Sequence, residues 1–250
     1  MNGKTVGYCC LLYGLDTLPY AIRSVIDFCD EFWVIHSFTP SHGHASEAIP
    51  PDHPADLYEA AKAVAGDKLR WYSQPTYAHE GVQRDMIYQL APDAQYIYVV
   101  DADEIWPNGL AGDVKAAAMQ EPEVYEWGIS LIHHWRSFYR AVTDDYAAPT
   151  RFIHTNGTTG LKRVFQGEKR LIHLGYAQSS KYVDYKVTCH GHKGEWRHDV
   201  NWLRDKWHAN AQLDVHPVNL DYWNPVDIDP WAHMPAFMRE HVYASEVIIP

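Results

Sequence analysis

The chain has 250 residues, of which 46% are hydrophobic and 21% are charged, as is typical of soluble globular proteins with one large domain or two small ones. The formal net charge of −11 disfavours a protein whose whole surface binds nucleic-acid phosphates, and no apolar run reaches the roughly 18 residues that a membrane span requires. The four cysteines follow no disulfide or zinc spacing and the N-terminus has no signal-peptide pattern, so we expect a cytoplasmic protein.

Strands and helices alternate through the first hundred residues. Pro19 suits the first turn of the first helix, and Gly66 and Pro92 end the two helices that follow. We expect strands at residues 4–14, 32–38, 69–73 and 96–100, and helices at residues 15–32, 57–66 and 80–92. This alternation predicts an α/β fold with a mainly parallel sheet flanked by helices, in which ligands bind beyond the carboxyl ends of the strands.

The second half of the chain has a less regular pattern. We expect helices at residues 109–122 and 195–213, strands at residues 124–135, 169–176 and 182–190, and a loop at residues 143–160. The tail from Asp214 is rich in Pro, Asp and Trp, with one short helix at residues 235–245. The sequence contains no flexible linker, so we expect residues 1–107 and 108–250 to form two halves of one continuous domain with an irregular C-terminal portion.

The stretch YIYVVDADEIWP, residues 96–107, runs an apolar strand into the carboxylates of Asp101, Asp103 and Glu104. Carboxylates this close repel one another unless a positive group lies among them. Residues i and i+2 of a strand point to the same side, so Asp101 and Asp103 can reach one ligand. The positive group is either Lys or Arg in a structural ion pair, or a hard cation such as Mg²⁺ or Mn²⁺ that completes its shell with phosphate oxygens.

VVDADEIWP resembles the D-x-D segment of GT-A fold glycosyltransferases, especially family 2-like enzymes. The opening strand VGYCCLLYG and the helix AIRSVIDFCDEF occupy the positions of that family's nucleotide-binding first unit. The segment LIHLGYAQSSKYVDYKV is similar to the later one in which a His completes the metal shell. The resemblance implies a GT-A, Rossmann-like fold, with nucleotide-sugar binding by residues 1–107 and acceptor binding by residues 108–250.

The same resemblance implies the roles of individual residues. It implies a divalent cation, Mn²⁺ or Mg²⁺, bound by Asp101, Asp103 and His173, and a nucleotide-sugar donor, with a UDP-sugar favoured, contacted by Tyr8, Arg84 and Asp101. Independently of the resemblance, Lys186 is expected to add a charge-assisted contact to a donor phosphate. Family 2 enzymes commonly carry an Asp after the second strand that contacts the base or ribose. The segment IHSFTPSHGH has no acid at that place, so His36, Ser37 or the backbone would have to substitute.

The chemistry of glycosyl transfer gives a role to both a cation and a general base. Breaking the bond from a sugar to a diphosphate builds negative charge on the leaving group, and a metal held by Asp103 can neutralise that charge. An inverting enzyme also needs a carboxylate that deprotonates the acceptor hydroxyl. Glu195 and Asp199 are the acids that we expect in this catalytic role, with Glu126, Asp144 and Asp145 as further candidates.

Each candidate also has an ordinary structural interpretation. Arg84 can be a solvated residue of its helix, and His173 can be a hydrogen-bonded core residue. The two H-G-H triplets, at residues 42–44 and 190–192, can chelate zinc or belong to loops. Several aromatic side chains can stack on a sugar or simply fill the core: His133, His134, Trp202, Trp207, Trp223 and Trp231.

Four functions remain in competition. The favoured one is a metal-dependent glycosyltransferase with a saccharide or other glycan acceptor. An alternative is a phage-type glycosyltransferase acting on hydroxymethylated bases in DNA, with Lys162, Arg163, Lys169 and Arg170 contacting phosphates. From other classes, a metallohydrolase or phosphotransfer enzyme could use the same acids, and a catalytically silent binding protein would use them only in ion pairs.

Overall fold

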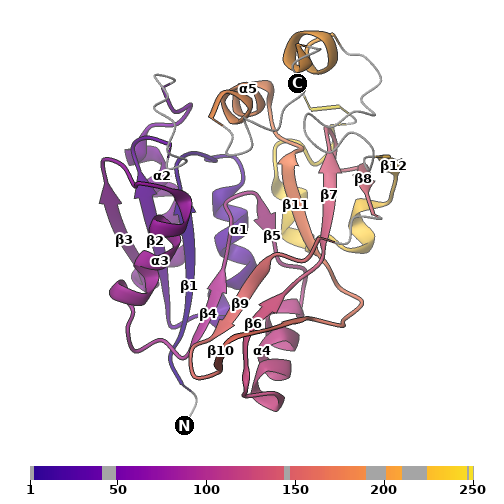
Figure 1. The fold of residues 1–250 in the computed structure, drawn as a ribbon. Helices are drawn as coiled ribbons and strands as arrows, with labels where there is room; N and C mark the ends of the chain where they lie inside the picture. The colour runs from indigo at the N-terminus through magenta and orange to yellow at the C-terminus, as the bar shows by residue number, and fades with distance from the viewer. Residues whose placement is uncertain are drawn as a thin grey trace.

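The computed structural model describes residues 3–40, 49–143, 147–189, 201–209, 224–246 and 248–249. Its larger sheet has seven strands (Figure 1). In spatial order they are β10 (Thr158–Val164), β6 (Val124–Gly128), β9 (Thr150–His154), β4 (Tyr96–Val99), β1 (Thr5–Leu11), β2 (Glu31–Ser37) and β3 (Leu69–Gln74). Only β9 runs antiparallel to its neighbours, so the predicted mainly parallel α/β sheet is confirmed.

Helices cover both faces of this sheet because its strands carry apolar side chains on both sides. Two consecutive residues of β1 show the division: Tyr8 packs in the cluster that contains Ile87, and Cys9 packs in the cluster that contains Ile22 and Leu110. The helices are α1 (Leu18–Val25), α2 (Pro54–Ala65), α3 (Glu80–Leu90) and α4 (Leu110–Gln120). Thus α3 lies on one face, and α1, α2 and α4 lie on the other.

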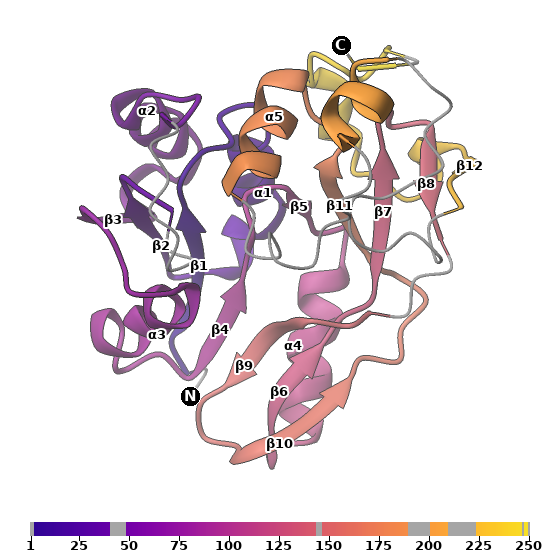
Figure 2. The same cartoon turned by 45° about the horizontal axis from the view of Figure 1, so that its top comes forward.

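A second, five-stranded sheet continues from the end of β4. In spatial order it contains β12 (Val226–Asp227), β8 (Arg140–Val142), β7 (Leu131–Trp135), β11 (Leu171–Tyr176) and β5 (Glu104–Ile105). The helix α5 (Ser180–Cys189) follows β11 and lies at the top of the molecule, between the end of β1 and the second sheet (Figure 1, Figure 2). Because β5 comes directly after the carboxylate motif, the motif lies where the two sheets meet.

Two expectations for the second half were wrong about strands. The single strand expected at residues 124–135 is two strands, β6 and β7, which are separated by Ile129 and Ser130 and belong to different sheets. The loop expected at residues 143–160 contains β9 and the start of β10. Turn-forming residues such as Pro149 and Gly157 flank a strand of only five residues, and β4 and β6 supply its hydrogen-bonding partners.

The strand expected at residues 182–190 was also wrong, because this segment is the helix α5. Its Tyr and Val residues favour a strand locally. However, Val183 and Val187 are four residues apart and both pack in the cluster that contains Trp135 and Trp207, which is the spacing of a helix face. Tertiary packing overrides the local preference here.

The C-terminal part is irregular, as expected. The short helix predicted at residues 235–245 is a 3₁₀ turn, Ala236–Glu240, and of the helix predicted at residues 195–213 the described part contains one π-helical turn, Leu203–Trp207. Among the described residues no helix is both long and apolar enough to cross a membrane. The larger sheet takes strands from both sides of residue 107, and the division of the domain at that residue stays a prediction.

Candidate functional site

The carboxylate motif forms a tight turn at the carboxyl end of β4. The Glu104 N–H donates to the Asp101 carbonyl across 3.0 Å, and β5 then pairs antiparallel with β11, with Glu104 opposite His173. The Leu174 N–H donates to the Asp103 carbonyl across 2.7 Å. The turn therefore reverses the direction of the chain after Asp101, and the two aspartates no longer follow the same-side rule of a continuous strand.

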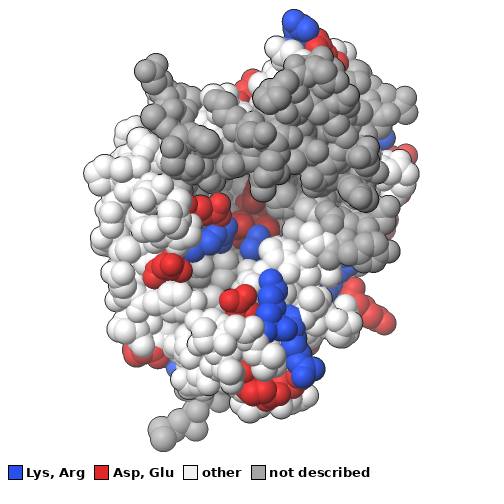
Figure 3. All heavy atoms as spheres, in the orientation of Figure 1, with Lys and Arg blue, Asp and Glu red and all other residues white. Residues whose placement is uncertain are grey.

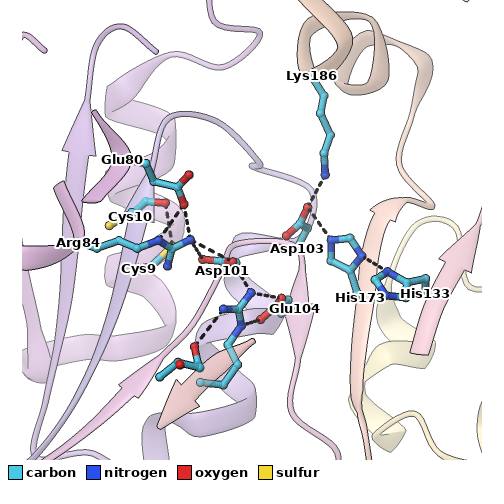
Figure 4. A network of polar contacts seen from close by, with 12 residues as sticks. Cys9, Cys10, Glu80, Arg84, Asp101, Asp103, Glu104, His133, His173 and Lys186 are labelled. Carbon is cyan, nitrogen blue, oxygen red and sulfur yellow. Dashed lines mark hydrogen bonds and ion pairs between the residues drawn. The ribbon is translucent and has the colours of Figure 1, made fainter. Parts of the chain in front are cut away.

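Asp101 points into a cluster of arginines. Figure 4 shows it directed toward Arg84, whose Nη2 lies 3.0 Å from Asp101 Oδ1. Arg151 Nη2 lies 2.7 Å from Asp101 Oδ2, and the same guanidinium contacts both oxygens of the buried Glu104 at 2.5 and 2.6 Å. Glu80 binds Arg84 from the other side at 2.6 Å. The cluster thus alternates acids and bases, and both oxygens of Asp101 are engaged.

The electrostatics of this cluster follow from burial and charge. Asp101 and Glu80 raise the pKa of Arg84 above its usual range, against the effect of burial. Burial raises the pKa of Glu104 to about 7, although Arg151 opposes that shift. Burial would also raise the pKa of Asp101, but Arg151 and Arg84 outweigh it, so this pKa is lowered.

Asp103 points the opposite way, toward the second sheet and α5 (Figure 4). Its Oδ2 lies 3.1 Å from Lys186 Nζ and 3.7 Å from His173 Nε2. Burial opposes ionisation of Asp103, but Lys186 and His173 hold its pKa well below its usual range. Burial lowers the pKa of His173 to about 3, so its imidazole is neutral near pH 7 and has one nitrogen free of a proton.

His173 is oriented from behind by a second histidine. Its Nδ1 lies 2.8 Å from Nδ1 of His133, which sits directly opposite it where β7 and β11 pair. When His173 Nδ1 donates in this hydrogen bond, its Nε2 presents a lone pair toward Asp103. Orientation of a ligand histidine through its other nitrogen is the usual arrangement behind metal sites.

A divalent cation fits beside Asp103 and His173, which offer the oxygen and nitrogen donors that Mn²⁺ accepts. Gly175 lets His173 and Lys186 pack close to the backbone, since a Cβ on this residue would lie 2.6 Å from His173 Nε2 and 2.7 Å from Lys186 Nζ. The described residues contain no group of three or more His, Cys, Asp or Glu side chains that could hold a metal. A cation would therefore need donor atoms from substrate or water as well, as Mg²⁺ sites commonly do.

Figure 3 shows acidic and basic side chains gathered around a hollow near the middle of the displayed face. Of the predicted donor contacts, Arg84 and Lys186 flank the carboxylate turn from α3 and α5. Tyr8 is buried on β1 in the cluster that contains Ile87 of α3. Burial raises the pKa of its phenol above the usual range, and the charge of the nearby Arg84 opposes this shift. The structure thus brings five of the predicted residues together around one turn, in two groups on opposite sides of it.

The predicted general bases have different outcomes. Glu195 and Asp199, with Asp144 and Asp145, lie outside the described residues. Glu126 lies on β6, where it accepts a hydrogen bond from the Thr150 hydroxyl at 2.7 Å.

The aromatic residues and H-G-H triplets fall into three groups. Trp202 and Trp207 are buried in a cluster with Trp135, as core packing predicts. Trp231 is half-buried beneath the guanidinium of Arg239. Both H-G-H triplets and Trp223 lie outside the described residues.

The basic residues proposed as a phosphate-binding patch are mostly used within the chain. Arg163 pairs with Glu121 at 3.0 Å, and Lys169 pairs with Asp113 at 2.8 Å. Arg170 donates to the backbone carbonyls of Thr143 and Leu131. No observation on the described residues favours DNA as an acceptor.

Arg151 is the site residue that the sequence did not reveal. It lies in the segment expected to be a loop, and its role depends on β9 inserting next to β4. The alternation in TRFIH, with Phe152 buried, was the available strand signal. Asp52 was missed as well: it is buried and accepts from the N–H groups of Gly14 and Leu15 at 2.8 and 2.9 Å and from the Tyr182 hydroxyl at 2.7 Å, linking the β1–α1 loop to α5.

Comparison with known proteins gives matches among solved structures only; no protein-family model and no curated protein matches the chain. Glucosyl-3-phosphoglycerate synthase from Mycobacterium tuberculosis, crystallised with Mn²⁺, UDP-glucose and phosphoglyceric acid, is 17% identical over 53% of this chain and 44% of that chain, with a TM-score of 0.35. S. aureus TarS 1-349 is 11% identical over 68% of this chain and 60% of that one, with a TM-score of 0.43. The chain spans about half the length of these structures, and none of the site assignments above depends on them.

Proposed function

We propose that this protein is a GT-A fold, family 2-like glycosyltransferase that moves a sugar from a nucleotide-sugar donor, with a UDP-sugar favoured, to an acceptor hydroxyl of a saccharide. One observation carries the proposal. Asp103, at the carboxyl end of a parallel strand, meets a neutral His173 and the cation of Lys186, which come from separate segments of the chain. Carboxyl ends of strands are where open α/β sheets bind nucleotides.

The two aspartates have different roles in this proposal. Asp103 and His173 would hold Mn²⁺ or Mg²⁺, which when bound neutralises charge on the diphosphate leaving group. Both oxygens of Asp101 accept hydrogen bonds from arginines, so the geometry favours Asp101 as the anchor of Arg84 and Arg151 in place of the metal-ligand role that the sequence suggested. Asp101 is thereby a positioning residue for the donor-side cations.

The chain's own cations complete the donor site. Arg84, held by Asp101 and Glu80, and Lys186, on α5, would donate charge-assisted hydrogen bonds to phosphate oxygens. Glu195 and Asp199 remain the proposed candidates for the base that accepts the proton of the acceptor hydroxyl. A carboxylate in that position is required only if the reaction inverts the anomeric centre.

Donor turnover tests the proposal. We expect release of nucleoside diphosphate from a nucleotide sugar in the presence of Mn²⁺, and its loss in the variant Asp103→Asn. Asp113→Asn is a matched control, because Asp113 also pairs with a lysine, at 2.8 Å, but lies on α4 away from the site. The proposal should be abandoned if a full panel of common nucleotide sugars gives neither metal-dependent turnover nor a metal-dependent thermal shift.

A further inference from the structure

Lys186 pairs with the oxygen of Asp103 that a divalent cation would also have to bind. Its Nζ lies 3.1 Å from Asp103 Oδ2, and His173 Nε2 faces the same oxygen from 3.7 Å. The Lys186 side chain is only 16% exposed, so water screens this contact weakly. The ammonium is therefore a built-in counter-ion of Asp103.

The ammonium of Lys186 and the imidazole of His173 both pack against Gly175. A Cβ on Gly175 would lie within 2.7 Å of both Lys186 Nζ and His173 Nε2, so this close arrangement requires a residue without a side chain. Both nitrogens also face Asp103 Oδ2, the oxygen that a cation held by Asp103 and His173 would bind. Such a cation would then lie within a few ångströms of the ammonium, and two positive charges at that separation repel strongly in a partly buried site.

A diphosphate would relieve this repulsion. Lysine carries its charge on a flexible four-carbon stem, which lets the ammonium move while α5 stays in place. Phosphate oxygens are stronger partners for an ammonium than a carboxylate oxygen that a metal also claims. The Tyr176 ring, whose centroid is 5.3 Å from Nζ, lies alongside the ammonium.

From this geometry we infer that Lys186 competes with the divalent cation for Asp103 and transfers to the diphosphate when the donor binds. The inference rests on the proposed function and adds a regulatory feature to it. The free protein holds the cation weakly, and the cation and the nucleotide diphosphate each increase the affinity for the other, as thermodynamic linkage requires. The cation site then forms fully only when there is a donor to activate.

Mn²⁺ affinity of the full chain, measured by electron paramagnetic resonance with and without UDP, tests this inference. Without UDP, we expect Lys186→Met to bind Mn²⁺ at least about tenfold more tightly than the wild type. We also expect UDP to increase the Mn²⁺ affinity of this variant much less than that of the wild type. Lys181→Met is the matched control: Lys181 is on the same helix but pairs with Asp52 at 3.3 Å, and its removal should leave the affinity within about twofold.

Lys186→Gln is a second variant for the case that Lys186→Met does not fold, because Gln carries no charge but can still donate a hydrogen bond to Asp103. We expect it to increase the Mn²⁺ affinity as well. Equal or weaker Mn²⁺ binding by either folded variant, with Asp103-dependent turnover intact in the wild type, would overturn this inference alone. Failure of every form to bind Mn²⁺, with or without UDP, would overturn both this inference and the metal-dependent function.

Discussion

Replacement of Arg151 by Met is the most informative perturbation of the fold. Arg151 is buried on β9 and bridges Glu104, at 2.5 and 2.6 Å, and Asp101, at 2.7 Å. Met keeps the length of the side chain but removes the charge and the donors. Asp101 retains Arg84 as a partner, whereas Glu104 is left as a buried carboxylate without its counter-ion.

The expected cost follows from this asymmetry. Removing one partner of a buried ion pair typically costs about 3–5 kcal/mol of unfolding free energy, which is a large part of the roughly 5–15 kcal/mol available to a protein. The surface pair of Arg70 with Glu31, at 3.1 Å, provides the matched control. Because the Arg70 side chain is 43% exposed, we expect Arg70→Met to cost only about 0–1 kcal/mol.

Two further measurements test whether the unpaired, buried carboxylate of Glu104 causes the loss of stability. In the double variant Arg151→Met/Glu104→Met we expect at least half of the loss to be recovered, because a buried ion pair can often be replaced by apolar residues. Burial already raises the pKa of Glu104 to about 7 in the folded wild type, and removal of Arg151 raises this pKa further. The folded variant therefore retains the Glu104 proton at a pH where the wild type has lost it, and its stability relative to the wild type falls as pH rises above about 7.

Urea denaturation followed by circular dichroism at pH 6 and pH 8 measures all four forms. The reasoning is refuted if Arg151→Met costs no more than Arg70→Met at pH 8, where Glu104 of the wild type is ionised, or if the double variant is no more stable than the single one at that pH. Either result would mean that Glu104 is not held by Arg151 in the way the distances indicate.

Two other predictions concern the Asp103 side of the turn. Gly175→Ala should weaken Mn²⁺ binding at least about tenfold in the presence of UDP, because its Cβ would lie 2.6 Å from His173 Nε2 and displace the imidazole ring. Calorimetry measures this affinity, and an unchanged value would contradict the proposed role of His173 as a ligand. Acid should destabilise the protein through His173, whose pKa is about 3 when folded and about 6.5 when unfolded, so that the unfolded state takes up the proton first. We expect a loss of at most about 2 kcal/mol from this residue between pH 7 and pH 5, with a smaller acid-induced loss in His173→Asn measured by chemical denaturation.

The local pattern of the first half was sufficient to predict its elements. The strands β1 and β4 are apolar on both faces and the helices between them have apolar stripes, so periodicity and burial agree there. The position of the acids at the carboxyl end of β4 followed from the same pattern. The resemblance to a known motif singled out Asp103 and His173, and the need for a cation at the diphosphate suggested Lys186; the structure brings His173 and Lys186 to one oxygen of Asp103.

Elements whose structure depends on contacts with distant parts of the chain could not be predicted from the local sequence pattern. The segment that forms α5 has residues that favour strands, and only its packing against Trp135 and Trp207 makes a helix the better choice. The segment that forms β9 is a strand because β4 and β6 flank it. Such partners are distant in sequence, and single-segment patterns contain no information about them.

The sequence by itself determined that a strand would end in three closely spaced carboxylates, those of Asp101, Asp103 and Glu104. It also determined that positive groups must lie among them, since like charges this close repel one another. Only the tertiary structure decided which charge each acid receives. The turn after Asp101 reverses the chain, so that Asp101 faces Arg151, 50 residues away, and Asp103 faces Lys186, 83 residues away. Counter-ions at such separations are chosen by how strands and helices pack, because contact in space, and not position along the chain, sets the energy of an ion pair.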